Sequence, residues 1–410
     1  MEAQAENTPR DWLSVPFDQA LAHIPGPRAR KLLARDYLTT GRFPVIDQGK
    51  RPVAGWTDDE SVVIDRGLPF VVFGDHTRTF KYVDVPFALG ADGTQLLKPS
   101  ADFHARFFYY ACLTLDVPNR GYNRHFALLK EHSIVRPPQR EQEGIAAVLR
   151  AVERAIEVED QLVSRLGELK QASMRELFTR GLHGEARKDT DIGQIPESWG
   201  VQPLAGLREF LQYGTSAKCD YDKGKKPVLR IPNVTNGRID WNDLKRCTLD
   251  ERDVAKWSLT PGDVLFIRTN GVRERVGTCA VYRGQPSEAL FASYLIRVRL
   301  RSEVLDPGFF QRYTSTAVGA AQLSGTASPA ADGKFNINTT TLDSVLVPLP
   351  RLDEQIEIAA ILDVIDKKLS VHERKRAVLQ DLFKTLLHDL MTGRIRVAVL
   401  DIDVSEVTAA

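Results

Sequence analysis

The chain has 410 residues, of which 43% are hydrophobic and 27% are charged. This apolar content can offset the entropy of ordering the chain, so the composition excludes wholesale disorder. At roughly 150 residues per domain, the length predicts two or three domains. Lysine and arginine number 55 against 54 for aspartate and glutamate, so the formal net charge is only +1. Any site for a polyanion must therefore be local.

The sequence also predicts a cytoplasmic protein. Its four cysteines lack zinc-ligand spacing and are typical of reduced thiols. The first residues lack the basic and then apolar order of a signal peptide. Because no apolar run reaches the roughly 18 residues that a membrane span needs, no membrane partner is expected.

Residues 1–136 are predicted to form a first mixed α/β domain. Short runs such as PFVVFG (69–74) lie between turns rich in Gly, Asn and Asp, as strands do. Two stretches, QGKR (48–51) and GDHTRTFKY (74–82), carry basic and hydroxyl side chains that suit phosphate or base contacts. The DNA-binding candidates of this domain are Arg42, Lys50, Arg51, Thr77, Arg78 and Lys81.

The sequence pattern of residues 137–182 predicts a long helix. Apolar residues recur at intervals of three, four or seven, between two prolines and a terminal Gly181. A helix of about 38 residues would be roughly 57 Å long, which exceeds one globular core, so its apolar stripe needs a partner helix. The candidates for helix pairing or subunit docking are Gln142, Ile145, Leu149 and Val152.

Residues 183–350 predict a second mixed domain, and this one is more basic. Residues 181–350 hold 22 basic and 19 acidic side chains, whereas residues 1–133 hold 16 of each. Arginine and asparagine can bond bidentately to guanine and adenine edges, and lysines in Gly-rich turns favour phosphates. The candidates fall in two turn-rich stretches and are Ser216, Lys218, Lys225, Lys226, Arg230, Asn233, Asn236, Thr269, Asn270, Arg273 and Arg275.

Residues 351–395 predict a second long helix, followed by a tail over 396–410, and the two helices are related. A shift of 213 positions places 134–156 on 347–369 without a gap, pairing Glu141 with Glu354. More distantly, Trp12 aligns with Trp199. This internal repeat predicts a pseudo-twofold relation in which the two helices pair as an antiparallel coiled coil. The pairing or docking candidates here are Gln355, Ile358, Leu362 and Ile365.

The predicted fold class is thus α+β, with two mixed α/β domains alternating with two long helices. Motifs that would indicate nucleotide binding or metal-dependent catalysis are missing from the sequence. The sequence contains no GxxxxGKS or GxxxxGKT, no GxGxxG and no HExxH. Its only Pro-Pro pair is followed by Gln139 rather than by the aromatic residue of DNA amino-methyltransferases. We therefore assign no catalytic residue, metal ligand or cofactor site.

Each long helix is introduced by prolines and a Glu-Gln pair, in PPQREQEGIAAVL and PRLDEQIEIAAIL. Together with the segments PVLRIPNVTNGRI and PGDVLFIRTNG, these helices resemble the specificity subunit of a type I restriction-modification system. The resemblance extends from about Trp12 to Gly393. It implies that each domain recognises one half of a split, asymmetric site in double-stranded DNA. It further implies that the helix pair separates the two domains and docks two methyltransferase subunits.

The same resemblance places the cofactors elsewhere. S-adenosylmethionine belongs to the methyltransferase subunits, and ATP and Mg belong to a restriction subunit in systems that have one. Two alternatives stay open at this stage. One is a coiled-coil scaffold that binds proteins without DNA specificity, and the other is a fused nuclease or methyltransferase, which the missing motifs disfavour.

Overall fold

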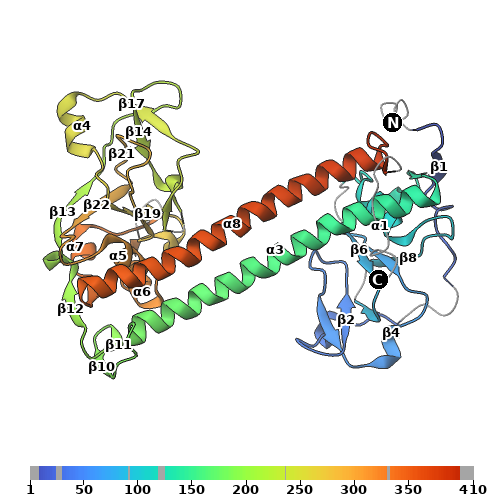
Figure 1. Ribbon diagram of the computed structural model, residues 1–410, viewed down its shortest axis with the longest axis horizontal. Coiled ribbons are helices and arrows are strands. Elements are labelled where there is room, and N and C mark those ends of the chain that lie inside the picture. The colour runs from blue at the N-terminus through green and yellow to red at the C-terminus, as the bar shows by residue number, and fades with distance from the viewer. Residues whose placement is uncertain are drawn as a thin grey trace. The chain divides into compact units, whose positions relative to one another are not determined.

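The structure is a computed structural model (Figure 1) that describes residues 9–24, 30–90, 93–118, 125–235, 237–329 and 333–397. The chain divides into two compact units. Unit 1 comprises residues 1–161 and 373–410, and unit 2 comprises residues 162–372. Each unit contains one globular segment and part of both long helices. Of the predicted features, Asn236 and residues 398–410 of the tail lie outside the described residues.

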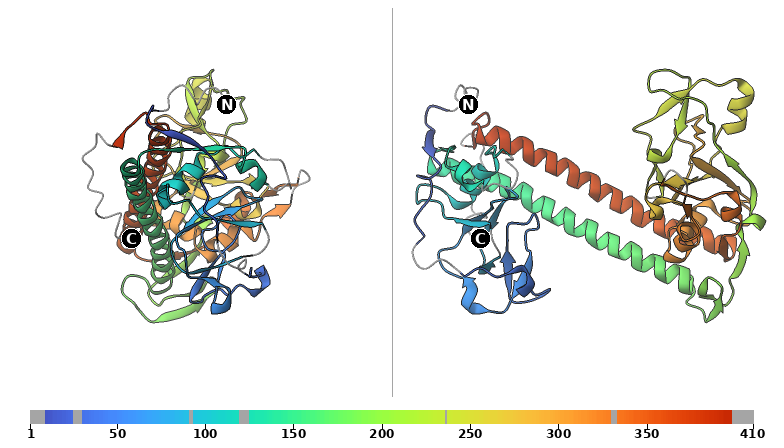
Figure 2. Two further views of the ribbon diagram at one scale, coloured as in Figure 1. Left: turned by 90° about the vertical axis from the view of Figure 1, so that its right-hand side faces the viewer. Right: turned by 180° about the vertical axis from the view of Figure 1, so that it is seen from behind.

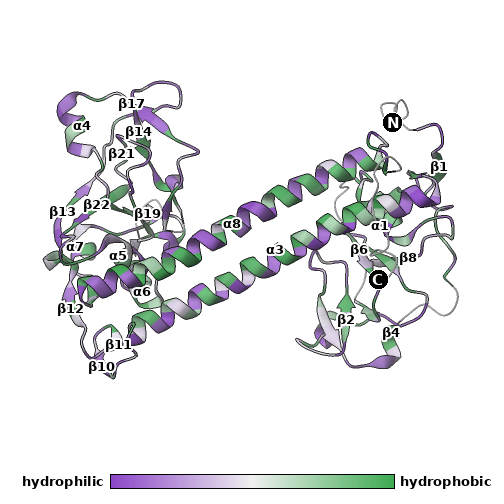
Figure 3. Ribbon diagram, viewed as in Figure 1, coloured by the Kyte–Doolittle hydropathy of each residue, from purple (hydrophilic) through white to green (hydrophobic). Residues whose placement is uncertain are grey.

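The two long helices are α3 (Gln139–Arg180, 42 residues) and α8 (Leu352–Met391, 40 residues). Each is followed by a glycine in the left-handed region, Gly181 with φ 62° and Gly393 with φ 72°. A side chain at either position would be strained, so glycine is the residue that lets the chain turn away there. Hydrophobic and hydrophilic residues alternate along both helices (Figure 3), as amphipathic helices require.

Within each unit, α3 and α8 lie side by side (Figures 1 and 2). Unit 1 holds the start of α3 and the end of α8, and unit 2 holds the end of α3 and the start of α8. The neighbours are therefore antiparallel in both units. The ion pairs that join the helices are Glu159–Lys375 (2.7 Å) and Asp160–Arg376 (3.1 Å) in unit 1 and Lys170–Asp366 (2.8 Å) in unit 2.

The globular part of unit 1 is built on two small sheets with the strand orders β3-β2-β7-β4 and β6-β5-β8, and on the antiparallel pair β1-β9. The predicted strand PFVVFG is confirmed as β5, whose five residues are all buried. The elements are β1 (Leu13–Pro16), β2 (Phe43–Ile46), β3 (Gly55–Thr57), β4 (Val63–Ile64), β5 (Phe70–Gly74), β6 (Phe80–Val83), β7 (Phe87–Leu89), β8 (Thr94–Leu97), α1 (Ala105–Leu113), α2 (Phe126–Leu129) and β9 (Ser133–Arg136).

The main core of unit 1 joins this globular part to the long helices. Phe107 and Phe108 on α1 are fully buried, and Ile145 and Leu149 on α3 belong to the same apolar cluster. From α8, Phe383 meets the ring of Tyr110 with centroids 6.0 Å apart. The long helices are therefore part of the core of unit 1, not an appendage to it.

Unit 2 has a four-stranded sheet, β13-β22-β18-β20, two three-stranded sheets, β17-β14-β21 and β19-β24-β23, and three strand pairs, β10-β11, β12-β25 and β15-β16. Its strands are β10 (Arg187–Thr190), β11 (Gly193–Pro196), β12 (Gly200–Pro203), β13 (Arg208–Tyr213), β14 (Lys226–Leu229), β15 (Val234–Thr235), β16 (Arg238–Ile239), β17 (Lys245–Cys247), β18 (Val264–Ile267), β19 (Thr269–Asn270), β20 (Cys279–Val281), β21 (Leu290–Phe291), β22 (Leu295–Leu300), β23 (Ser328–Pro329), β24 (Phe335–Asn336) and β25 (Leu346–Leu349). Its shorter helices are α4 (Glu251–Trp257), α5 (Pro307–Thr314), α6 (Ala317–Ser324) and α7 (Thr339–Asp343).

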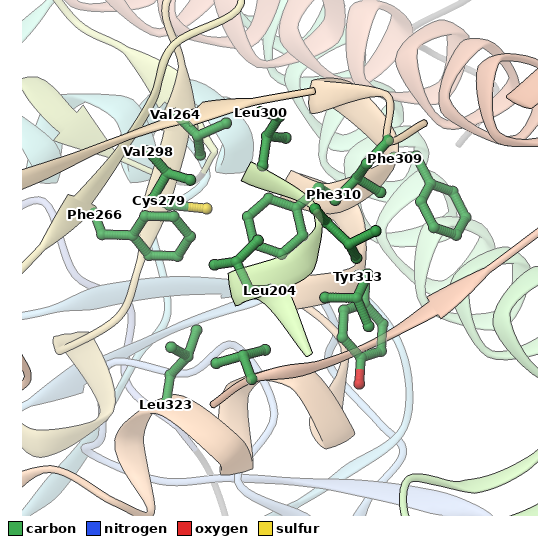
Figure 4. Packing of buried hydrophobic residues seen from close by; sticks show 14 of the residues in the cluster. Leu204, Val264, Phe266, Cys279, Val298, Leu300, Phe309, Phe310, Tyr313 and Leu323 are labelled. Carbon is green, nitrogen blue, oxygen red and sulfur yellow. The ribbon is translucent and has the colours of Figure 1, made fainter. Parts of the chain in front are cut away.

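The core of unit 2 lies between the four-stranded sheet and α5 (Figure 4). Phe266 on β18 and Phe310 on α5 have ring centroids 5.9 Å apart. Phe309, the preceding residue on α5, packs against Phe178 of α3 at 5.1 Å. In this way α5 connects the sheet to the long helices. Among the described residues, none of the helices combines the length and apolarity that would let it cross a membrane.

Candidate nucleic-acid interface

A buried glutamate at the start of α3 ties together three distant parts of unit 1. Glu141 is 4% exposed and accepts a hydrogen bond from Trp12 Nε1 at 3.2 Å. Arg396, just past α8, donates to both Glu141 oxygens at 2.5 Å and reaches Asp11 at 2.7 Å. These hydrogen bonds raise the pKa of Arg396. A buried carboxylate needs such partners, so this glutamate fixes both chain segments to the start of α3.

A second buried glutamate does the same in unit 2. Glu354, at the start of α8, is 8% exposed and accepts from Trp199 Nε1 at 3.1 Å. The backbone N–H of Leu182, just past α3, donates to its other oxygen at 3.0 Å. Each long helix thus begins at a Trp–Glu hydrogen bond and receives the end of the other helix there. The distant alignment of Trp12 with Trp199 carried this signal, although the sequence analysis gave neither residue a role.

The glutamine after each of these glutamates forms a hydrogen bond to the residue that caps a short helix of the globular part. Gln142 Oε1 accepts from His104 N at 2.8 Å, and its Nε2 donates to Pro137 O at 2.9 Å. Gln355 Oε1 likewise accepts from Asp306 N at 2.9 Å, and its Nε2 donates to the carbonyl oxygens of residues 350 and 304, both at 2.9 Å. His104 and Asp306 are the N-cap residues of α1 and α5. Each glutamine therefore orients a globular helix against a long helix.

Farther along the helices, the two units use different groups at matching positions. Tyr110 donates its hydroxyl to Glu153 at 3.0 Å in unit 1, and burial raises the pKa of this tyrosine. In unit 2 the matching carboxylate is Asp366, which is 5% exposed and binds Lys170 and Arg312. Burial alone would raise the pKa of Asp366, but these two cations outweigh it and hold the pKa below its ordinary value. Arginines 106 and 150 also pair with Glu153, at 3.5 and 3.0 Å, so cations neutralise the carboxylate in both units and unit 1 adds a tyrosine hydroxyl.

In unit 1, the structure brings the two predicted basic stretches together. The Thr77 hydroxyl and the Lys81 ammonium donate to the carbonyls of residues 48 and 47, the latter at 2.9 Å. Burial lowers the pKa of Lys81. Arg78 donates to the carbonyl of residue 117 at 2.9 Å. Lys50 and Arg51 are exposed beside this turn.

Arg42 does not share these contacts. It is exposed and pairs with Glu60 at 2.6 Å, and its backbone N–H bonds to Asp58 at 2.8 Å. Among the predicted contacts of unit 1, Lys50 and Arg51 are therefore those most open to an anionic ligand, because the cationic groups of Lys81, Arg78 and Arg42 already have partners.

In unit 2, the first basic stretch gathers around an exposed tyrosine. Tyr221 is 54% exposed, and its ring lies under Arg230 at 5.6 Å and Lys245 at 4.9 Å. Ser216, Lys218 and Lys225 are exposed along the same stretch. Figure 3 shows α4 and the chain around β17, at this end of the unit, as mainly hydrophilic. Tyr221 and Lys245 were not among the predicted contacts, because charge and turn residues indicate an exposed loop but not which aromatic ring its cations cover.

A second group surrounds Arg268, at the end of β18. Its guanidinium lies over the ring of Tyr213 at 5.0 Å, and its NH1 is 3.4 Å from Ser293 O. Tyr294 beside it is 56% exposed. A guanidinium held by a ring and a carbonyl keeps donors for another ligand, so Arg268 belongs in the candidate interface, together with Asn270.

Four of the predicted contacts in unit 2 serve the fold in this structure. Asn233 is 1% exposed, and its amide bonds to three backbone groups, at residues 230, 240 and 243. Thr269 is 8% exposed, within a β strand. Lys226 pairs with Glu288, and Arg273 donates to the carbonyls of residues 324 and 325 at 2.9 and 2.8 Å. A buried amide with all its groups bonded cannot also bond to a base edge, which corrects the expectation for Asn233. Arg275 remains exposed.

Comparison with known proteins agrees with this architecture. Residues 196–381 match a family model described as the type I restriction modification DNA specificity domain. A putative type I restriction enzyme MjaX specificity subunit from Methanocaldococcus jannaschii is 31% identical over 206 residues, which cover 50% of this chain and 48% of the relative. The EcoKI specificity subunit from Escherichia coli is 26% identical over 414 residues, which cover 89% of this chain and 86% of the relative.

A solved structure has the same fold across the chain. The type I restriction-modification S subunit from M. genitalium matches with a TM-score of 0.64 at 16% identity, covering 94% of this chain and 96% of that one. This chain is similar to type I restriction-modification specificity subunits. It spans only 48% and 61% of the length of the two M. jannaschii relatives, MjaX and MjaVIII.

The structure also places the residues that were predicted to pair the helices or to dock a subunit. Gln142, Ile145 and Leu149 are at most 1% exposed, and Val152 is half-buried. The second-helix set is buried as well; it comprises Gln355, Ile358, Leu362 and Ile365, at 0, 0, 0 and 8% exposure. A separate subunit cannot reach buried side chains. Their contacts are with the chain's own core.

Proposed function

We propose that this chain is the non-catalytic DNA-recognition subunit of a type I restriction-modification complex. Unit 1 and unit 2 would each recognise one half of a bipartite, asymmetric target in double-stranded DNA. Two methyltransferase subunits carrying S-adenosylmethionine would join it, and a restriction subunit using ATP and Mg completes the complex in systems that restrict. Such an assembly works on chromosomal DNA, which places it in the cytoplasm.

The observation that carries this proposal is the junction that is built twice. In both units a tryptophan N–H, a helix-starting glutamate and the adjacent glutamine fix a globular part to a long helix. The sequences of the two globular parts differ widely. A protein that recognises two unlike DNA half-sites requires two dissimilar domains that are attached in the same way. It also supports the pseudo-twofold repeat and the pairing of the helices as an antiparallel coiled coil, which we include in the proposal.

We further propose the contacts on each side. In unit 1 the candidate DNA contacts are Lys50, Arg51 and the neighbouring turn that contains Thr77, Arg78 and Lys81. In unit 2 they are the exposed residues around Tyr221 and around Arg268. Lysines at such positions would bind phosphates, and arginine and asparagine side chains would bond to base edges. A near-neutral chain fits this role because its partners supply part of the affinity for DNA.

Exposed apolar residues of α8 are the proposed docking points. Val364 is 52% and Val371 50% exposed in unit 2, and Val378 is 67% exposed in unit 1. They recur at intervals of seven, as residues that pack against a further helix do. Buried residues of the same helix are committed to the chain's own core, so we assign methyltransferase docking to this exposed set.

The experiment is co-expression of this chain with the methyltransferase encoded beside it, followed by co-purification and sequencing of adenine methylation in the host. We expect a bipartite methylated motif that disappears when this chain is omitted. A matched control is the Val378→Lys variant, which should lose co-purification while the chain itself stays folded. Methylation of the same motif without this chain would refute the proposal. Failure of the wild-type pair to assemble would instead favour a scaffold that binds other proteins.

A further inference from the structure

Two of the four cysteines lie opposite each other on neighbouring strands. Asp220 and Arg246 form an isolated antiparallel bridge in unit 2 and exchange both backbone hydrogen bonds, at 2.9 and 2.7 Å. The residues next to this bridge are Cys219 on one strand and Cys247 on the other. In an antiparallel ladder, the pair next to a hydrogen-bonded pair is a non-hydrogen-bonded pair. Its side chains point to the same face.

The geometry of such a pair suits a disulfide. The Cα atoms of a non-hydrogen-bonded pair are about 4.5 Å apart, and disulfides join Cα atoms that are about 4.4 to 6.8 Å apart. Independent contacts support the same placement, because Cys219 packs against the apolar cluster that contains Cys247. Both sulfurs are free thiols in this structure.

The surrounding backbone holds the pair in place. The N–H of Lys225 donates to Cys247 O at 3.1 Å, and β17 also pairs with β14. A side chain at Gly224, where φ is 134°, would come within 2.6 Å of the backbone of residues 246 and 247. The stretch from 219 to 226 therefore lies closely against β17, and forming the bond needs no large movement of the backbone.

We propose that Cys219 and Cys247 are a modification site, at which a low-molecular-weight disulfide such as glutathione disulfide converts the two thiols into a reversible intramolecular disulfide. The Cys219 thiolate attacks one sulfur of the small disulfide, forming a mixed disulfide and releasing one thiolate. Cys247 then loses its proton and attacks the Cys219 sulfur, releasing the second small thiolate. Both cysteines are oxidised by one electron each, and the small disulfide is reduced to two thiols.

Exposure sets the order of these steps. Cys219 is partly exposed, whereas Cys247 is 2% exposed. Burial, with the adjacent Cys219 thiol, raises the pKa of Cys247 to about 11. Cys247 is thus a poor first nucleophile for a molecule in solution and is well placed to resolve a mixed disulfide on Cys219. Disulfides of cytosolic proteins are commonly transient ones of this kind.

The other two cysteines serve as internal controls. Cys112 is fully buried on α1, and burial raises its pKa. Cys279 is 3% exposed, with its sulfur 3.1 Å from Thr314 Oγ1, in a different apolar cluster from Cys247. Among the described contacts, neither has a cysteine neighbour.

The test treats the purified full chain with glutathione disulfide, blocks the remaining thiols with an alkylating agent and digests it with trypsin without reduction. Cleavage after Lys218 and Arg246 releases residues 219–223 and 247–252. We expect these two peptides joined in one species, with the loss of two thiols per chain, and dithiothreitol should restore both thiols. Cys112→Ser and Cys279→Ser should leave the joined peptide unchanged.

Two variants test the proposal, and any of three outcomes overturns it. Cys219→Ser should abolish the joined peptide, and so should Cys247→Ser. Cys247 is buried, so its substitution could disturb the core. Cys219 is partly exposed, so the Cys219→Ser variant tests the cross-link without that disturbance. The proposal is overturned if glutathione remains on Cys219 while Cys247 is alkylated, if the cross-link joins two chains, or if it forms only in denaturant. These readouts need no DNA, so they are independent of the proposed function.

Discussion

Gln355→Leu tests whether the glutamine at the start of α8 fixes the globular part of unit 2. The substitution keeps the side-chain volume and removes the hydrogen bonds to the N–H of Asp306 and to the carbonyls of residues 304 and 350. A stranded buried N–H costs about 1 to 3 kcal/mol, and the loss of a typical hydrogen bond to a carbonyl costs about 0.5 to 1.5 kcal/mol. The expected loss is therefore about 3 kcal/mol. It should fall on the start of α5, which Asp306 caps.

Hydrogen exchange measured by mass spectrometry can localise this loss, whereas one unfolding midpoint would merge two units. We expect peptides covering α5 to exchange about a hundredfold faster, since about 1.4 kcal/mol corresponds to a factor of ten. Gln142→Leu should produce the same effect at α1 in unit 1. Arg351→Gln, at a side chain that is 87% exposed, should change protection by less than about 0.5 kcal/mol. An acceleration below about threefold in the Gln355 variant would contradict a role for Gln355 in holding the start of α5.

Four further predictions concern buried contacts and the candidate DNA interface. Trp199→Phe removes one donor from buried Glu354 and should cost about 1 to 3 kcal/mol, measured as faster exchange at the start of α8; unchanged exchange would contradict a role for the indole N–H. Because the pKa of Asp366 is lowered in the folded chain, its stabilisation is fully present above the ordinary aspartate pKa and is lost as the pH falls through the lower folded value. An acid titration of the Asp366→Asn variant should lack this loss of stability. An acid transition identical to that of the wild type would contradict the stabilising role of Asp366. Lys225→Gln should weaken binding to all DNA sequences and reduce the slope of log affinity against log salt by about 0.9. Arg268→Ala should instead relax the preference at one base by about 1 to 3 kcal/mol. Binding titrations at several salt concentrations distinguish the two effects, and equal losses on all sequences would make Arg268 a phosphate contact.

Patterns that act along the chain were predictable without tertiary structure. The apolar spacing predicted the two long helices, because a helix exposes one face at fixed intervals. Short apolar runs between turn residues, such as the one that became β5, predicted strands, because a run of four to eight apolar residues is typical of a buried strand. The 213-residue shift related the two Glu-Gln pairs, since a repeated sequence needs no three-dimensional information to be detected. The resemblance to specificity subunits rested on these same features.

The sequence could not show which side chains lie free at the surface. Lys50 and Asn233 both lie in polar, turn-rich stretches, yet Lys50 is exposed and Asn233 is 1% exposed with its amide fully bonded. The sequence likewise predicted that Leu149 pairs helices or docks a subunit, and the structure shows it buried in the core of its own unit.

By itself, then, the sequence determined the helices, the repeat and the likeness to a family of DNA-recognition subunits. Only the tertiary structure joined Trp12 to Glu141 and Trp199 to Glu354, and only it placed Cys219 opposite Cys247. The physical reason is that periodicity depends on neighbours in the chain. Burial, hydrogen-bond partners and strand register depend on residues more than a hundred positions away, or on the path of a loop that no local pattern specifies.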